Sequence, residues 1–196
     1  MNKKNRTWII VIAALLVVVL WGVKLNNRFV SLEEGAEGQW ANVENVYQRR
    51  ADLIPNLVNT VKGYAEHEQE TFTEVIEARA KATSVTIDPS NITPESLAAF
   101  QQAQDGLSGA LSKLLVSVER YPELKANQNF LELQAQLEGT ENRIAVERRK
   151  FNELVRAFNT SIRKFPASFI AGLTARTKMG YFEAVAGSEV APVVEF

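Results

Sequence analysis

The sequence contains no cysteine among its 196 residues and only one histidine, His67. Without cysteine there can be no disulfide, thiolate metal site, cysteine nucleophile or lipid-modified amino-terminal cysteine. One histidine cannot supply the two Glu-x-x-His motifs of a di-metal helical bundle, and the residue three before it is Tyr64. Gly-rich phosphate loops and the Gly-x-Ser-x-Gly and His-Glu-x-x-His motifs are also missing. We therefore expect no enzyme, and no catalytic, cofactor-binding or metal-binding residues.

The chain also has little net charge, because 22 Lys and Arg stand against 23 Asp and Glu and leave a net charge of -1. A nucleic-acid partner is not expected, since binding phosphates requires a positive surface. Six prolines and ten glycines gather mostly at segment edges. The long intervals between them are filled by Ala, Leu, Glu, Gln, Lys and Arg, a composition that predicts an all-α protein.

A long uncharged apolar run follows a short basic leader, residues 1–6. The run covers residues 7–23, and as a helix it would reach about 26 Å, the short end of what spans a bilayer. Trp8 and Trp21 lie near its two ends, where indole rings favour the membrane interface. Residues 7–23 therefore predict a single transmembrane anchor, with the lipid bilayer as its partner.

A cleaved signal peptide is the alternative to an anchor. Its cleavage site requires small residues two positions apart after the apolar run, and residues 21–25 lack them. We therefore favour a retained anchor. Three basic residues precede the run and two follow closely, so the positive-inside rule places the amino terminus in the cytoplasm. This predicts a single-pass membrane protein with its remaining domain exported to the extracytoplasmic side.

Four segments after the run show the spacings of three and four residues between apolar positions that are typical of amphipathic helices. Nothing breaks a helix between the anchor and the first segment. The predicted helices extend from Phe29 to Ile54, from Pro55 to Thr83, from Pro94 to Tyr121, and from between Glu123 and Phe130 to Phe165. Mostly short connections favour antiparallel neighbours, so residues 24–183 predict an up-and-down antiparallel four-helix bundle. Residues 184–196 are expected to form a flexible tail.

The last predicted helix carries an apolar residue at every seventh position, which we call the heptad ladder. Its members are Phe130, Leu137, Ile144, Phe151, Phe158 and Phe165. Asn152 and Asn159 each follow a ladder phenylalanine, and we interpret them as solvated residues beside the core rather than a binding stripe. The chain after this helix keeps Phe169, Leu173, Tyr181 and Phe182, which we expect to dock on the bundle.

Asp52, Pro55 and Asn56 mark the junction between the first two predicted helices. Proline lacks the backbone donor that an uninterrupted helix needs, and it disfavours helical geometry at the preceding residue. Residue types alone leave a hairpin and a kink open as alternatives. We favour a helix break at these three residues.

Charged residues interrupt the apolar faces near the middle of the predicted bundle. Arg50, Glu68, Glu141 and Arg148 are placed so that they predict one buried polar layer across the helices. Such a layer fixes helix register at a cost in stability. The alternative interpretation is a carboxylate metal site or an enzyme that uses Glu68, Glu141 and His67.

Several segments resemble the signature of the LemA family of bacterial membrane proteins. They are Arg49–Val58, Val61–Glu68, Tyr121–Ala126, Glu141–Ile144 with Arg148, Phe151-Asn152, Phe158-Asn159, Phe165-Pro166 and Ala191–Phe196. The resemblance implies a single-span protein with a four-helix bundle. It implies no catalytic residue, because the family has no established catalytic activity.

Together these observations predict a non-enzymatic, membrane-anchored interaction or scaffold protein of the bacterial envelope. Its expected partners are the bilayer and other envelope proteins. Self-association into a homo-oligomer through apolar residues of the anchor or the tail is a further possibility. A carboxylate metal-binding or enzymatic bundle, and a membrane-remodelling or stress-signalling protein, remain as alternative functions.

Overall fold

The computed structural model describes residues 3–65 and 68–183, and every regular element within these ranges is helical. The elements are α1 Lys3–Lys62, α2 Gln69–Ser84, the 3-10 turn η1 Pro89–Asn91, α3 Pro94–Val118, α4 Pro122–Lys125, α5 Gln128–Arg163 and α6 Ala167–Leu173. The predicted all-α class and the long apolar amino-terminal helix are confirmed. His67 and the predicted flexible tail, 184–196, lie outside the described residues.

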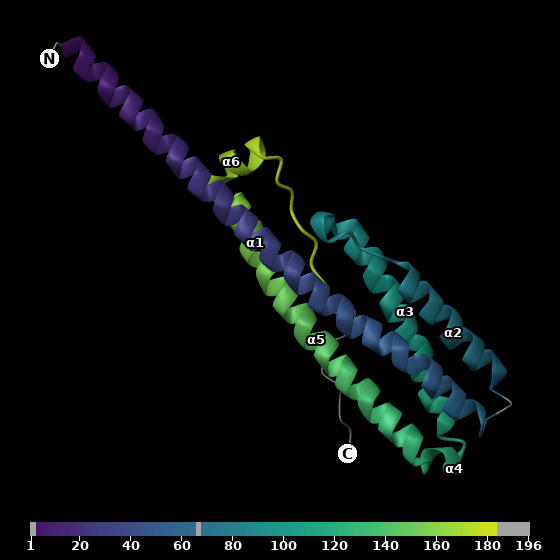
Figure 1. The fold of residues 1–196 in the computed structure, drawn as a ribbon. Helices are drawn as coiled ribbons and strands as arrows, with labels where there is room; N and C mark the ends of the chain where they lie inside the picture. Colours follow the sequence, from purple (N-terminus) through teal and green to yellow (C-terminus); the bar gives the residue numbers. More distant parts are fainter. Residues whose placement is uncertain (1–2, 66–67, 184–196) are drawn as a thin grey trace, which may run out of the picture.

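The longest element, α1, contains 60 residues and is about 90 Å long. Its amino-terminal part projects alone, and α5 runs antiparallel along its distal part (Figure 1). The hairpin of α2 and α3 packs beside the distal end of α1, and α6 lies across α1 beyond the end of α5 (Figure 1). The molecule therefore consists of two helix pairs, α1 with α5 and α2 with α3, rather than four helices of equal length.

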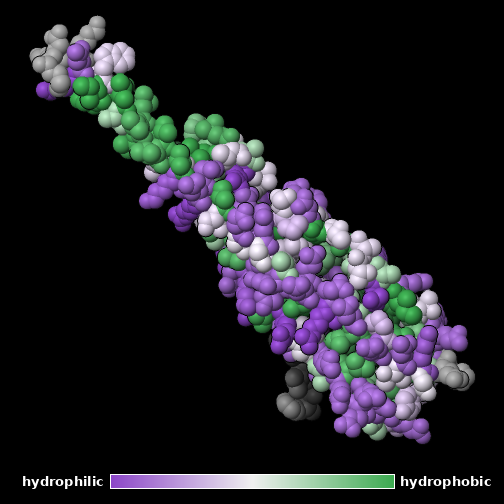
Figure 2. All heavy atoms as spheres, in the orientation of Figure 1, coloured by the Kyte–Doolittle hydropathy of each residue, from purple (hydrophilic) through white to green (hydrophobic). Residues whose placement is uncertain are grey.

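The apolar run is exposed along its length except at Gly22, which is half-buried. None of its most apolar stretch is buried within the protein. Every large apolar side chain from Trp8 to Val23 faces solvent, which gives the projecting end its uniformly hydrophobic surface (Figure 2). Within the described residues α1 is the one helix long and apolar enough to cross a membrane.

The helix break predicted at Asp52, Pro55 and Asn56 is wrong, because α1 continues through all three residues to Lys62. Pro55 cannot donate a hydrogen bond to the carbonyl of Ala51, four residues earlier. That buried carbonyl instead accepts a hydrogen bond of 2.7 Å from Nε of Arg79 on α2. A side chain from a neighbouring helix thus takes the place of the missing backbone donor. The predicted second helix is correspondingly shorter and begins at Gln69 rather than Pro55.

Buried apolar side chains form two clusters along the bundle. The proximal core, nearer the apolar run, is built around Phe29, Trp40, Tyr47, Phe100, Phe151, Phe158, Met179 and Phe182. The distal core is built around Ile54, Leu57, Val61, Phe72, Leu107, Leu114, Phe130 and Leu137. In the proximal core the Trp40 ring stacks on Phe182 at 6.0 Å and meets Phe100 and Phe151 edge-on. Such aromatic pairs stabilise a core beyond the area that they bury.

The heptad ladder is buried as predicted except at its last position. Phe165 is 90% exposed, because α5 ends at Arg163 and this residue lies in the turn to α6. The prediction that Phe169 and Leu173 dock on the bundle is also wrong, since they are 69% and 70% exposed. Tyr181 is also exposed, at 43%, whereas Phe182 docks as expected.

Candidate functional site

A buried arginine separates the two cores. Arg50 on α1 lies between Tyr47 of the proximal core and Ile54 of the distal core, and its side chain is 2% exposed. Its guanidinium donates to Oε1 of Glu141 on α5 at 2.8 Å. The same group donates to Gln104 Oε1 at 2.6 Å and to Ser108 Oγ at 2.8 Å, both on α3. One side chain thereby connects three helices.

This polar cluster is open to solvent on one side only. Glu141 is 45% exposed, so water screens its charge while Arg50 stays enclosed. The Arg50 guanidinium also lies 5.1 Å from the centre of the Tyr47 ring. Burial raises the pKa of the Tyr47 phenol, and the nearby positive charges of Arg148 and Arg50 oppose that rise. The tyrosine is therefore neutral at physiological pH and acts as a packing partner of the cation.

The structure brings together Arg50 and Glu141 of the predicted polar layer and places the other two members elsewhere. Glu68 lies before α2 and accepts hydrogen bonds from Arg120 at 2.8 Å and from the Tyr121 hydroxyl at 3.1 Å. Burial, together with this bond to Glu68, raises the pKa of Tyr121. Glu68 thus helps to close the distal end of the bundle rather than its middle.

Arg148 contacts the carboxyl-terminal part of the described chain. It donates to the carbonyl of Glu183 at 2.8 Å, and its guanidinium lies 4.7 Å from the centre of the Phe182 ring. Gln104 and Ser108 take the remaining positions around Arg50, and sequence reasoning missed both as site residues. The signal for Gln104 was present, since it is a polar residue in the apolar seam of α3. Ser108 gave no comparable signal.

The residues of the predicted helix break have local roles within α1. Asp52 accepts a hydrogen bond from Gln48 at 2.7 Å, and the carbonyl of Asn56 accepts one from Thr60 at 2.9 Å. Neither contact interrupts the helix. Of these three residues only Pro55 has a long-range effect, because the Ala51 carbonyl that it cannot bond accepts a hydrogen bond from Arg79.

A second polar arrangement holds the non-helical residues 176–183, which we call the strap. Three side-chain amides each exchange two hydrogen bonds with one strap residue: Asn159 with Met179 at 2.9 and 3.0 Å, Asn152 with Phe182 at 2.9 Å in both directions, and Gln101 with Glu183 at 3.1 Å in both directions. We call these three residues the amide clamp. Each member donates to a backbone carbonyl and accepts from the backbone N–H of the same residue.

The spacing of the amide clamp matches the two kinds of backbone. Asn152 and Asn159 are seven helical residues apart, about 10.5 Å along α5. Their partners, Phe182 and Met179, are three residues apart, about 10 Å in an extended chain. The interpretation of both asparagines as solvated residues is therefore wrong, and Asn159 is 4% exposed. Their separation of seven residues was the signal that could have identified them.

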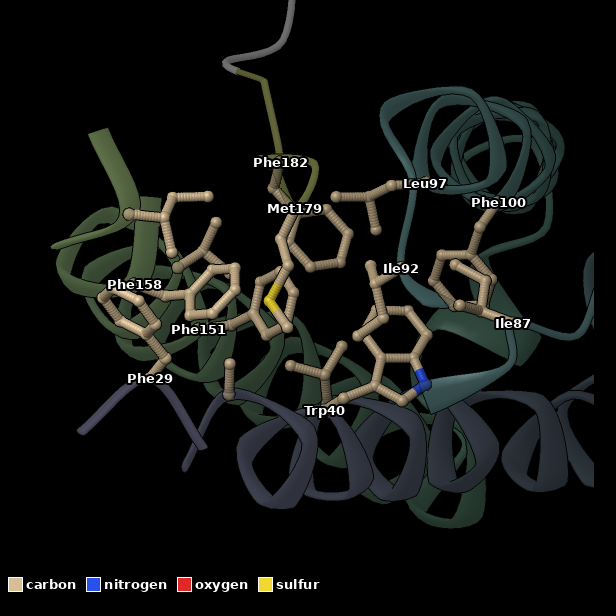
Figure 3. Close-up of a cluster of buried hydrophobic side chains, with 14 of the residues drawn as sticks. Phe29, Trp40, Ile87, Ile92, Leu97, Phe100, Phe151, Phe158, Met179 and Phe182 are labelled. Carbon is tan, nitrogen blue, oxygen red and sulfur yellow. The ribbon is translucent and has the colours of Figure 1, made fainter. Parts of the chain in front are cut away.

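The strap also approaches the start of α3 very closely. The backbone N–H of Gly180 donates to the carbonyl of Ile92 at 3.1 Å. A Cβ at position 180 would lie 2.9 Å from both Pro94 Cα and the Thr93 carbonyl oxygen, so only glycine fits. On either side of it, Met179 and Phe182 point into the proximal core, between the phenylalanines of α5 and Leu97 of α3 (Figure 3).

The side-chain amides of the clamp are suited to binding a polypeptide backbone. Amide pairs directed at main-chain N–H and C=O groups bind an extended backbone whatever its side chains. Among residues 3–65 and 68–183, no group of three or more His, Cys, Asp or Glu side chains is placed to hold a metal ion. A groove of about 410 Å³ continues beyond the polar cluster between α3 and α5, lined by Leu111, Leu115, Leu137 and Glu141 among others.

A family model and individual relatives both match this chain. The model of the LemA family matches residues 39–196. The chain is 27% identical to a magnetosome protein MamQ of Magnetospirillum gryphiswaldense, over 80% of this chain and 64% of that protein. It is 25% identical to a protein LemA of Metamycoplasma hominis, over 66% of this chain and 55% of that protein. The chain thus spans less than two thirds of the length of these relatives.

Proposed function

The chain belongs to the LemA family, whose model matches most of its length, and from this membership we propose that it is a non-enzymatic, single-pass membrane module. In this proposal the helical domain binds or scaffolds other proteins of the bacterial envelope. One observation carries the proposal: an exposed apolar run continues, within a single helix, into a packed helical domain. A soluble protein would bury such a run.

The use of polar side chains in the domain supports a binding role rather than catalysis. Arg50 and Glu141 join helices, and the amide clamp holds the strap by its backbone. The Nη atoms of Arg50 and the amides of the clamp are hydrogen-bonded within the domain, whereas a catalytic group is directed at its substrate. We propose that residues 7–23 bind the lipid bilayer of the inner membrane, that the domain faces the periplasm, and that its partners are envelope proteins.

The anchor can be tested by charge substitution. The double variant Leu15→Arg and Val18→Arg should move the protein from the membrane to the soluble fraction after alkaline carbonate extraction, because each arginine opposes insertion by about 3 kcal/mol. Val116→Arg places the same charge on a residue that is 67% exposed in α3, and it should leave the protein in the membrane. Retention of the double variant by carbonate-washed membranes would contradict the anchor.

Orientation and partners need separate measurements. Protease added to intact spheroplasts should degrade the domain, and protection until lysis would reverse the proposed orientation.

Crosslinking of the full chain in native membranes should capture envelope proteins in a fixed stoichiometry with this chain. Elemental analysis of the purified chain tests the competing function, since a stoichiometric content of iron, manganese or zinc would overturn the non-enzymatic proposal.

A further inference from the structure

An exposed apolar surface follows the end of α5. Phe165, Phe169 and Leu173 are 90%, 69% and 70% exposed, and they are spaced four residues apart. Phe169 and Leu173 lie on one side of α6 because they are four helical residues apart, and Phe165 lies in the turn just before this helix. The opposite side carries Ala167 and Ala171, which are buried in the proximal core. α6 is thus apolar on both sides, although only one side contacts protein.

The position of α6 indicates what covers its exposed side. A Cβ on Gly22 would lie 3.5 Å from Cδ1 of Ile170, so α6 packs against the last turn of the apolar run. In the space-filling view the hydrophobic surface at α6 adjoins that of the projecting end of α1 (Figures 1 and 2). The exposed face of α6 is therefore continuous with the surface proposed to lie in the bilayer.

Charge at this level of the molecule agrees with a lipid surface. Lys24 and Arg28 follow the apolar run, and Arg163, Lys164 and Lys178 flank α6; all five side chains are exposed. Arg176 is also close by and pairs with Glu33 of α1. Exposed cations beside large apolar side chains are characteristic of helices that lie in the headgroup region of a membrane.

We propose that α6, together with Phe165, is a second membrane contact that lies in the bilayer interface beside the anchor. Phe165, Phe169 and Leu173 enter the boundary between headgroups and acyl chains, and the surrounding lysines and arginines face the lipid phosphates. This inference rests on the proposed anchoring of α1. It adds a surface contact, made by the end of the domain, to the span itself.

The absence of cysteine allows a direct test with single spin labels on the full chain. Phe169→Cys reports on α6, Val18→Cys reports on the anchor, and Val116→Cys is the matched control, an equally exposed apolar residue in α3. Each variant is labelled and reconstituted in vesicles of phosphatidylcholine and phosphatidylglycerol. Collision rates with oxygen, which concentrates in lipid, are compared with those of a water-soluble nickel chelate. Circular dichroism checks that the three variants have the same helix content.

The expected result is an oxygen-to-nickel ratio at position 169 that is severalfold higher than at position 116 and lower than at position 18. A water-like ratio at position 169 with a lipid-like ratio at position 18 would overturn the inference and leave the anchor intact. Water-like ratios at both positions would overturn the anchor and α6 together. Shielding of position 169 from both reagents would also overturn it, because protein, such as a second copy of the chain, would then cover the face.

Discussion

Asn159 takes the place of water for a stretch of backbone that is itself neither helix nor strand. Its amide satisfies both the N–H and the carbonyl of Met179, in a place where neither residue is more than 7% exposed. Buried backbone groups need such partners, and losing one costs free energy comparable to that of a hydrogen bond. Asn159 therefore allows the backbone of Met179 to be buried in the core.

We expect Asn159→Ala to lower the free energy of unfolding by about 2 kcal/mol, because it leaves two buried backbone groups without partners. Asn152→Ala should cost less, since Asn152 is only half-buried. Chemical denaturation monitored by circular dichroism measures both. Asn142→Ala, on the exposed side of the same helix, is the control and should change little. Equal stabilities of Asn159→Ala and the control would show that the clamp does not hold the strap.

Glu37 is placed where its charge is unfavourable. Burial raises its pKa, and the negative charges of Glu34 and Asp88 raise it further. A raised folded-state pKa contributes stability below the unfolded value, and that stability is lost as pH rises through the folded pKa. Glu147 behaves in the opposite sense, since hydrogen bonds from Lys150 and Gln39 lower its pKa, and its contribution is lost in acid.

Glu37→Gln should therefore raise the melting temperature at pH 7, and the gain over the wild type should disappear near about pH 4. Thermal melts at a series of pH values measure the difference. Glu44→Gln, which removes an exposed carboxylate from the same helix, is the matched control. A gain that is the same at pH 4 and pH 7 would mean that ionisation of Glu37 is not its cause.

At the scale of elements, the continuity of α1 depends on a contact with another helix. Pro55 leaves the Ala51 carbonyl without its helical donor, and Arg79 of α2 supplies one. The two residues should be coupled energetically. Arg79→Met should cost about 2 kcal/mol in the wild type, because it leaves a buried carbonyl unpaired. In a Pro55→Ala background the restored N–H should reduce that cost by about 1 kcal/mol.

Denaturant unfolding of the four proteins in this double-mutant cycle gives the coupling energy. Arg149→Met, which removes an exposed arginine from α5, should show no coupling to Pro55→Ala. Additive effects of Pro55→Ala and Arg79→Met would contradict the proposed replacement of the backbone donor.

The strap depends on glycine at one point. Gly180→Ala should displace the strap from α3, because the new Cβ would lie 2.9 Å from two backbone atoms that cannot move independently. We expect a loss of about 2 kcal/mol and faster hydrogen exchange at the Met179 and Phe182 amides. Gly139→Ala in α5 meets nothing within 4 Å and should instead stabilise the protein by up to about 1 kcal/mol. An unchanged exchange rate in Gly180→Ala would contradict the tight approach.

Much of the helical pattern was readable because burial imposes a period on side chains. The spacing of apolar residues predicted the helix that begins at Pro94 and five positions of the heptad ladder. The helix break predicted at Pro55 was wrong because Arg79, 24 residues later in the sequence, supplies the hydrogen-bond donor that proline lacks. Rules based on neighbouring residues do not describe such a contact. The docking of the strap could not be predicted from the sequence, because side chains that hydrogen-bond to its backbone require no particular side-chain pattern in the strap itself. Phe165 continues the heptad period after the helix has ended.

At the scale of the whole molecule, Arg50 joins two separate cores into one structure. Glu141→Gln keeps the shape of the cluster and removes its negative charge. We expect a loss of about 1 kcal/mol, smaller than for a fully buried pair because Glu141 is nearly half exposed. Calorimetry measures the change, and Glu132→Gln on the exposed side of α5 should leave the melting temperature within error. An unchanged melt for Glu141→Gln would remove this charge from the forces that unite the cores.

Because α1 is unbroken, its membrane-proximal and distal parts tilt together as one rigid rod. About 58 Å of this helix extends beyond residue 23, with α5 stiffening it for most of that length. Transmembrane helices lean by about 20° on average, and by more in thin bilayers, so such a lean would move the far end sideways by about 20 Å. Within α1 there is no break between residues 7–23 and the domain that could act as a hinge and absorb the tilt. A change in bilayer thickness would thus change the lateral position of the far end of the domain. Contact of α6 with the membrane surface would determine the direction in which α1 tilts.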